Sequence, residues 1–299
     1  MSDATPILHM LSPQKHMSPF DVNMAADAGY KVIVPYINVQ LEETTALVQD
    51  AIFSRPPDYG SHTGMFIGGK DAILALDMLE AARKALVPPF QLSVLADPAG
   101  SFTTAAAMVA CVERVLKQKF GRGWAGTKVA VFGATGVVGF ASSIITALEG
   151  AKVQLVVDRG VDRVIKSAAV SKERFGVDLE AVAGETEDQK RAIIENAEVI
   201  FAAAAAGVQV ISKEQKQYAK NLLVVADVNA VPPPGVEGME LFMDGAPLPD
   251  CDAFGVGPLA IGDIKYKTES GLFKQMIGSK DPVMLDFRHA FALARQLVA

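Results

Sequence analysis

Three evenly spaced glycines provide the clearest chemical signal in the sequence. Gly133, Gly136 and Gly139 follow an apolar run that predicts a strand, 128–132, and precede a stretch that predicts a helix. In this pattern the first glycine permits a tight turn, the second lets the backbone approach a diphosphate, and the third brings the helix close to the sheet. The helix N-terminus would then hold the diphosphate of a dinucleotide. The residues expected to contact it are Gly133, Ala134, Thr135, Gly136, Val137, Val138 and Gly139.

A carboxylate, Asp158, follows the next predicted strand, 152–157, about 20 residues after the glycines, as in dinucleotide-binding folds. It would accept hydrogen bonds from the adenosine ribose of NAD and repel the 2′-phosphate of NADP. Arg159 and Arg163 would instead bind that phosphate, or they are solvated surface charges. The combination predicts either a preference for NAD or the use of both NAD and NADP.

Two later predicted strands, 199–203 and 222–227, should end at the same edge of a parallel sheet, on the nicotinamide side of the cofactor. Small residues there leave room for the ring. Asn229 could hydrogen-bond the carboxamide, or it could form a turn before the prolines that follow. The cofactor-binding residues expected at this end are Ala203, Ala204, Val228 and Asn229.

Alternating elements in the first third of the chain must position a second set of loops. Apolar runs predict strands at 6–11, 32–35, 65–67 and 90–96. Helical spacing of apolar residues predicts helices at 20–28, 42–53 and 71–86. This alternation favours a parallel α/β sheet.

A long apolar helix, 103–120, comes next, and Ser101 is its expected N-cap. We expect the junction between two domains within it. A second alternating series begins at residue 128, with helices starting near 137, 161 and 212. An amphipathic helix, 286–298, ends the chain. The predicted fold class is therefore α/β, with an N-terminal α/β domain and a Rossmann domain built on a parallel sheet.

Composition excludes several classes of protein. The 299 residues are 50% hydrophobic and 21% charged, and their net charge of −6 argues against a nucleic-acid partner, which leaves a basic footprint. Neither Cys111 nor Cys251 lies in a metal-ligand spacing, so we expect reduced thiols and no metal. We find no signal peptide and no apolar run long enough for a membrane. These features predict a cytoplasmic protein.

Five segments taken together show a family likeness. They are 15–21, 66–69, 97–104, 226–233 and 254–265, which read KHMSPFD, FIGG, DPAGSFTT, ADVNAVPP and FGVGPLAIGDIK. Essentially end to end, the chain resembles the methylene-tetrahydromethanopterin dehydrogenases of methylotrophic bacteria, most closely the branch that accepts NAD as well as NADP. The resemblance implies hydride transfer from methylene-tetrahydromethanopterin to NAD(P)+, which gives the methenyl cation and NAD(P)H.

The resemblance also implies an organisation. Residues 1–105 would form a pterin-binding domain, residues 106–270 a Rossmann domain for NAD(P), and residues 271–299 helices that return to the N-terminal domain. The fold would be similar to that of bifunctional methylene-tetrahydrofolate enzymes, in a homo-oligomer. The expected partner is a small pterin, with no nucleic acid and no membrane.

The implied reaction moves no proton, so the enzyme needs positioning and electrostatics rather than a general base. Two residues are candidate catalytic groups. Asp97 could stabilise the developing cation, or its carboxylate could form the loop in which it lies. Lys265, in a glycine-rich segment, could contact the substrate or could be a surface charge.

The other substrate-binding candidates each have a structural alternative. Phe20 and Phe102 could form aromatic walls for the pterin or pack in the core. Asp21 could bind the pterin ring or stabilise the start of a helix. The polar residues Ser101, Thr103 and Thr104 could bind substrate or cap the long helix.

Three other functions remain open on the sequence alone. A methylene-tetrahydrofolate dehydrogenase would keep the same fold and cofactor. A non-catalytic NAD(P)-binding sensor would keep the glycine motif, without a reason to keep the pocket sequence 97–104. A dehydrogenase of the shikimate or semialdehyde type would need a proton-handling Lys/Asp pair or a nucleophilic Cys, and neither Cys111 nor Cys251 lies in a nucleophile-like turn.

Overall fold

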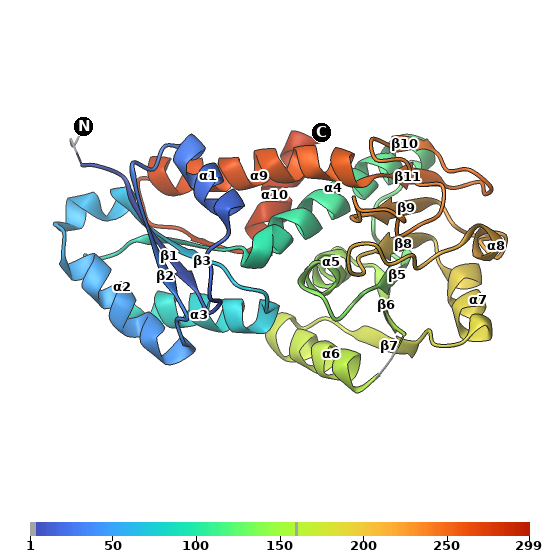
Figure 1. The fold of residues 1–299 in the computed structure, drawn as a ribbon, viewed down its shortest axis with the longest axis horizontal. Helices are drawn as coiled ribbons and strands as arrows, with labels where there is room; N and C mark the ends of the chain where they lie inside the picture. Colours follow the sequence, from blue (N-terminus) through green and yellow to red (C-terminus); the bar gives the residue numbers. More distant parts are fainter. Residues whose placement is uncertain (1–3, 159–160) are drawn as a thin grey trace. The chain divides into compact units, whose positions relative to one another are not determined.

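The computed structural model describes residues 4–158 and 161–299, and Figure 1 traces its elements along the chain. The chain divides into two compact units. Unit 1 comprises residues 1–103 and 266–293, and unit 2 comprises residues 104–265 and 294–299. The chain passes between them within three helices, α4 (Ser101–Phe120), α9 (Pro258–Gly278) and α10 (Phe287–Leu297). Each unit has its own largely parallel sheet, which confirms the predicted α/β fold class.

Unit 1 contains a five-stranded parallel sheet in the order β12-β4-β3-β1-β2. Its strands are β1 (Ile7–Ser12), β2 (Val32–Ile37), β3 (Thr63–Ile67), β4 (Ser93–Ala96) and β12 (Met284–Leu285). The connecting helices are α1 (Pro19–Ala28), α2 (Thr44–Phe53) and α3 (Ala72–Ala85), with α1 on one face of the sheet and α2 and α3 on the other (Figure 1). Because helices cover both faces, every residue of β3 and β4 is buried. Because these strands run parallel, the loops after β1, β3 and β4 emerge at the same, carboxyl edge of the sheet.

Unit 2 contains a seven-stranded sheet in the order β10-β11-β9-β8-β5-β6-β7, parallel except for the β10/β11 pair. Its strands are β5 (Lys128–Phe132), β6 (Lys152–Val157), β7 (Leu179–Ala183), β8 (Val199–Ala202), β9 (Val224–Asp227), β10 (Asp244–Pro247) and β11 (Phe254–Val256). Its helices include α5 (Val137–Leu148), α6 (Asp162–Phe175), α7 (Glu187–Asn196) and the short α8 (Lys213–Lys216). The sheet order reverses at β5, and the carboxyl ends of strands flanking such a point form the usual ligand site.

Several local predictions were wrong. The interval between residues 161 and 199 holds β7 and α7 as well as α6, and α7 was missed because few of its residues are apolar. The composition of the glycine-rich segment that contains Lys265, 254–265, is typical of a loop, but its first residues form β11 and α9 begins at Pro258. Proline suits a first helical turn, where its missing N–H would have no helical partner.

Helix α4 is a core helix. Together with the preceding turn, Pro98–Phe120 is long and apolar enough to cross a membrane by length and composition. However, 78% of its apolar window is buried inside the protein, which is typical of a helix in the core of a globular fold. Ser101 is the first residue of α4 and not its N-cap, because the carboxylate of Asp97 accepts the N–H groups of Phe102 and Thr103.

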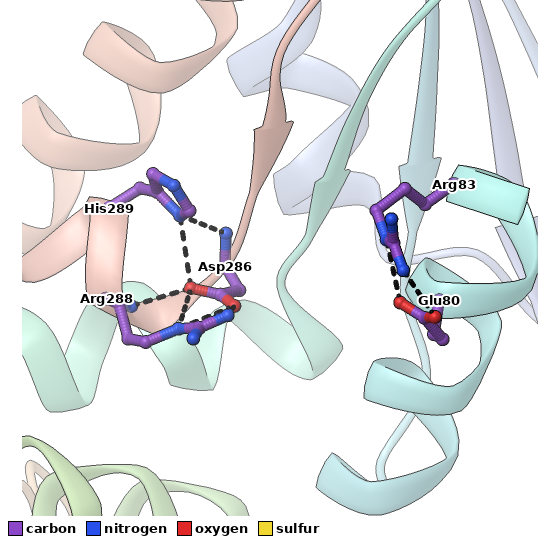
Figure 2. A network of polar contacts seen from close by, with 5 residues as sticks. All are labelled: Glu80, Arg83, Asp286, Arg288 and His289. Carbon is purple, nitrogen blue, oxygen red and sulfur yellow. Dashed lines mark hydrogen bonds and ion pairs between the residues drawn. The ribbon is translucent and has the colours of Figure 1, made fainter. Parts of the chain in front are cut away.

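Asp286, which follows β12, anchors the start of α10 (Figure 2). Its side chain is 1% exposed and accepts hydrogen bonds from the backbone N–H, Nε and Nη2 of Arg288, while His289 Nδ1 lies 3.1 Å from Oδ1. Burial alone would raise the pKa of Asp286, but His289 and Arg288 lower it to about 2. The carboxylate is therefore ionised at neutral pH.

We expect Asp286→Asn to lower the free energy of unfolding by about 2 kcal/mol at neutral pH, because a depressed pKa means that the ionised form stabilises the fold. That contribution is complete above the ordinary pKa near 4 and disappears as the pH falls through about 2. Urea denaturation of both proteins at several pH values measures it. In the matched control, Glu80→Gln, the lost ion pair with Arg83 is exposed (Figure 2), so little change should follow. A constant gap at all pH values would contradict this account.

Candidate functional site

The glycine loop after β5 has no room for side chains at two of its three glycines. Gly133 has φ +80°, and a Cβ there would lie 2.4 Å from the backbone carbon and oxygen of Ala203. A Cβ on Gly139 would lie 2.5 Å from the carbonyl oxygen of Gly133. At Gly136, by contrast, the nearest atom to such a Cβ would be 3.4 Å away, and the residue is exposed. The loop is thus pressed against the sheet on one side and open at Gly136.

Helix α5 begins at this open glycine. Gly136 is its N-cap and has no side chain that could accept the first N–H groups of the helix, and the N–H of Gly136 itself donates to the carbonyl of Gly133 at 3.0 Å. A helix N-terminus in this state presents backbone donors and a positive dipole end to an anion. The residues present therefore fit the diphosphate of a dinucleotide. Of the loop residues predicted to bind it, Thr135 is exposed and Ala134 is buried behind the turn.

The predicted ribose-binding residues lie beside this loop. β6 pairs with β5 in parallel, with Val156 opposite Phe132, so Asp158 follows its strand at the same edge as Gly133. Asp158 is exposed, and Arg163 is exposed on the first turn of α6. Arg159 lies outside the described residues.

The ends of β8 and β9 meet the same edge. Ala203 is buried against the glycine turn and donates its N–H to Phe132 at 2.9 Å, while Ala204 is half-buried. Val228 donates its N–H to Ala202, which places it beside them. The backbone of the glycine turn lies so close to Ala203 and Ala204 that a Cβ added at Gly133 would come within 2.4–2.5 Å of them.

Asn229 is tied into its own loop. Its Oδ1 accepts the N–H groups of Gly207 (3.1 Å) and Val231 (3.0 Å), and its Nδ2 donates to the carbonyl of Pro233 (2.8 Å). These bonds correspond to the turn-forming alternative. An amide nitrogen carries two hydrogens, so a second Nδ2 hydrogen is the donor that this side chain could offer a nicotinamide carboxamide.

Asp227, which was not among the predicted site residues, organises the same loop. It is fully buried at the end of β9, and its two oxygens accept the N–H groups of Asn229 (2.9 Å) and Val236 (3.0 Å). Burial raises the pKa of Asp227, although backbone N–H groups oppose that effect. Asp227 could have been predicted from the sequence, because it is an aspartate at the end of an apolar strand, and ligands bind at the carboxyl ends of such strands.

Unit 1 contains a separate cavity of about 450 Å³ at the carboxyl edge of its sheet. The loops after β1, β3 and β4 form it together with the start of α1. Its lining residues are Ser12, Gln14, Lys15, His16, Met17, Ser18, Pro19, Asp21, Gly69, Lys70 and Ala99. Asp21 is 2% exposed on the first turn of α1, whose N-cap is Ser18. Phe20 is 46% exposed and is not among the lining residues.

Asp97 is completely buried, two residues before the cavity-lining Ala99. Its Oδ1 accepts the N–H groups of Phe102 (2.8 Å) and Thr103 (3.2 Å), and its Oδ2 accepts the hydroxyl of Thr103 at 2.6 Å. The structure thus brings three predicted residues together around the start of α4. Phe102 is fully buried, with its ring packed edge-on against Phe287 at 5.1 Å, which matches the core-packing alternative.

The remaining predicted residues occupy helices. Ser101 and Thr104 are half-buried in the first turn of α4. Lys265 is 9% exposed on α9. It is therefore not an exposed surface charge. Among the described residues no group of three or more His, Cys, Asp or Glu side chains is placed to hold a metal ion.

A larger cavity, of about 660 Å³, lies at the opposite, amino edge of the unit 2 sheet. Lys128, Lys152 and Asn196 line it, and none of the predicted site residues that the structure describes do. The glycine loop lies at the carboxyl ends of the strands, so this cavity is not part of the dinucleotide site. Cys111 is also remote from nucleophilic chemistry, because burial raises the pKa of its thiol to about 12.

Comparisons with known proteins show similarity in both sequence and fold. A family model described as the N-terminal part of methylene-tetrahydromethanopterin dehydrogenase matches residues 19–99. An NAD(P)-dependent methylenetetrahydromethanopterin dehydrogenase of Methylorubrum extorquens is 50% identical over 98% of this chain and 99% of its own. The bifunctional protein MdtA of the same organism is 31% identical over 94% of each chain. A shikimate 5-dehydrogenase of Listeria monocytogenes, 14% identical, shares the fold with a TM-score of 0.51 over 92% of each chain.

Proposed function

Since the chain belongs to the family of NAD(P)-dependent methylenetetrahydromethanopterin dehydrogenases, we propose that it oxidises methylene-tetrahydromethanopterin to the methenyl form. The protein is an NAD(P)-dependent oxidoreductase. The close packing of Gly133 and Gly139 and the open position of Gly136 support the assignment of the cofactor to the glycine loop. When bound, NAD+ or NADP+ supplies the two-electron acceptor for the reaction.

The pterin is proposed to bind in the cavity of unit 1. It lies at the carboxyl ends of parallel strands, and the segment matched by the family model, 19–99, includes Pro19, Asp21, Gly69, Lys70 and Ala99 of its lining. A pterin ring presents N–H groups that a carboxylate binds through charge-assisted hydrogen bonds. In this proposal the carboxylate of Asp21 accepts hydrogen bonds from N–H groups of the pterin ring. Ser101, Thr103 and Thr104 remain predicted contacts at the start of α4, and Phe20 and Phe102 remain predicted aromatic neighbours.

The reaction requires the chain to orient the substrate and to stabilise charge, and it requires no proton transfer. A C–H bond of the methylene carbon breaks with both electrons moving to the nicotinamide, and the positive charge left behind spreads over the adjacent nitrogens. Asp97 is proposed to stabilise that charge from the start of α4, and Lys265 to contact the substrate. Fixed geometry and electrostatic stabilisation would supply most of the rate enhancement.

The relative use of NAD and NADP is proposed to depend on Asp158, with Arg159 and Arg163 as the opposing charges. We expect Asp158→Ala to raise the ratio of kcat/KM for NADP to that for NAD by about tenfold, because the variant loses ribose hydrogen bonds and repels the 2′-phosphate less. Steady-state assays with each cofactor measure the ratio. Asp162→Ala, at the first residue of α6, is the control and should leave the ratio nearly unchanged. Equal losses with both cofactors would contradict the proposed role.

A homo-oligomer that acts on a small molecule in the cytoplasm, without nucleic-acid or membrane partners, completes the proposal. Its support is the acidic net charge of −6 and the family membership. Analytical ultracentrifugation of the purified protein reports the oligomer.

The test of the proposed function is a parallel assay of cofactor reduction, followed by near-ultraviolet absorbance. Purified protein receives methylene-tetrahydromethanopterin or methylene-tetrahydrofolate, each with NAD or NADP. We expect the wild-type protein to turn over the methanopterin substrate. In Asp21→Asn we expect a higher KM for this substrate and an unchanged KM for the cofactor. Turnover with the folate alone would replace the proposed substrate by its runner-up. Cofactor binding without any turnover would favour the sensor function.

A further inference from the structure

We propose that Ala99 is a substrate-positioning residue, whose methyl group contacts the pterin in the cavity of unit 1. The inference rests on the proposed function and adds a residue to it. Ala99 is exposed, and it lines the cavity together with Asp21. It lies between the buried residues Pro98 and Gly100 in the turn after β4.

The backbone of Ala99 has an unfavourable conformation. With φ 55° and ψ 30° it lies in the left-handed region, where the Cβ of an L-residue comes too close to the following carbonyl group. Among the described residues, the other non-glycine residues with positive φ are Asn38 and Asp250. Asn and Asp tolerate this region because their side chains hydrogen-bond locally, and alanine has no such compensation.

The neighbouring structure dictates this conformation. The backbone carbonyl of Asp97 accepts the N–H of Gly100 at 3.2 Å, and that of Pro98 accepts the N–H of Ser101. The Asp97 carboxylate accepts a hydrogen bond from the first turn of α4. Gly100 itself has φ 62°. Glycine at position 99 would meet the same constraints without the steric conflict. Strain that the surroundings impose is typical of ligand sites.

The methyl group is all that alanine adds to glycine here. It is exposed at the wall of a cavity of about 450 Å³, close in sequence to the buried charge of Asp97. A methyl contact to a flat fused ring restricts how the ring tilts, and the tilt decides whether the methylene carbon faces the acceptor. Removing one methyl group from a well-formed pocket changes kcat/KM by about tenfold.

The test is Ala99→Gly. We expect a melting temperature equal to or above that of the wild type, a kcat/KM for methylene-tetrahydromethanopterin about tenfold lower, and an unchanged KM for NAD. Asn38→Gly is the matched control, because Asn38 has φ 57° in the same unit but does not line the cavity. It should retain the wild-type kcat/KM.

Wild-type kcat/KM in Ala99→Gly would overturn the inference. So would a fall in melting temperature that accompanies the kinetic loss, since Ala99 would then act through the fold. The proposed function fails separately, if the wild type does not turn over the pterin or if Asp21→Asn has a normal KM. A raised KM in Asp21→Asn beside normal kinetics in Ala99→Gly would reject the inference alone.

Discussion

Replacing Gly133 by alanine is expected to abolish NAD(P) binding and to reduce kcat/KM by more than about 100-fold. The new Cβ would lie 2.4 Å from the backbone of Ala203 and 2.5 Å from the nitrogen of Ala204, at a residue with φ +80°. Backbone atoms cannot rotate away as a flexible side chain can. The turn must therefore move away from β8, and the donors at the start of α5 move with it.

The same substitution should lower the free energy of unfolding by about 2–4 kcal/mol, the sum of left-handed strain and overpacking. Cofactor titration by fluorescence and urea denaturation measure the two effects. Gly121→Ala separates them, because Gly121 has φ +63° but a Cβ added there would meet no atom within 4 Å. The control should lose about 1–2 kcal/mol and bind the cofactor normally. Equal cofactor affinity in both variants would contradict the assigned role of the loop.

Asp97→Asn is expected to reduce kcat by about 100-fold, with little change in the affinity for NAD. Asparagine retains an oxygen for the N–H groups of Phe102 and Thr103, so the start of α4 should survive. The negative charge, which the developing methenyl cation would need, is lost. The substitution therefore separates electrostatic stabilisation from the capping that the structure shows.

Asp71→Asn is the matched control for Asp97→Asn. Asp71 caps α3 in the same unit, and its Oδ1 accepts the N–H groups of Ile73 and Leu74 at 2.9 Å. It should keep a normal kcat. Near-normal turnover in Asp97→Asn would show that Asp97 serves the fold alone, and circular dichroism confirms that each variant is folded.

The cofactor loop was predictable because its signal is local. The strand 128–132, the glycine turn and the start of α5 are contiguous, and an added Cβ would meet backbone atoms at two of the three glycines, Gly133 and Gly139. The strand 152–157 was predicted with the bounds that β6 has. Apolar residues covered on both faces by helices make such strands easy to recognise.

The hydrogen bonds of Asn229 and Asp97 were less predictable than the cofactor loop. Which atoms Asn229 binds depends on Gly207, far earlier in the chain, and on the turn that Asp227 fixes. The role of Asp97 as the cap of α4 depends on the left-handed turn at Ala99, which no alanine propensity predicts. α9 was missed because its proline and glycines are typical of loops, although they occur here at a helix start.

Isotope transfer tests the central claim most directly. Methylene-tetrahydromethanopterin with both hydrogens of its methylene carbon replaced by deuterium is incubated with the enzyme and NAD+, and the reduced cofactor is analysed by mass spectrometry. Direct hydride transfer without a general base predicts one deuterium in each NADH molecule and none in the solvent. Deuterium released into water, or NADH without label, would contradict the account.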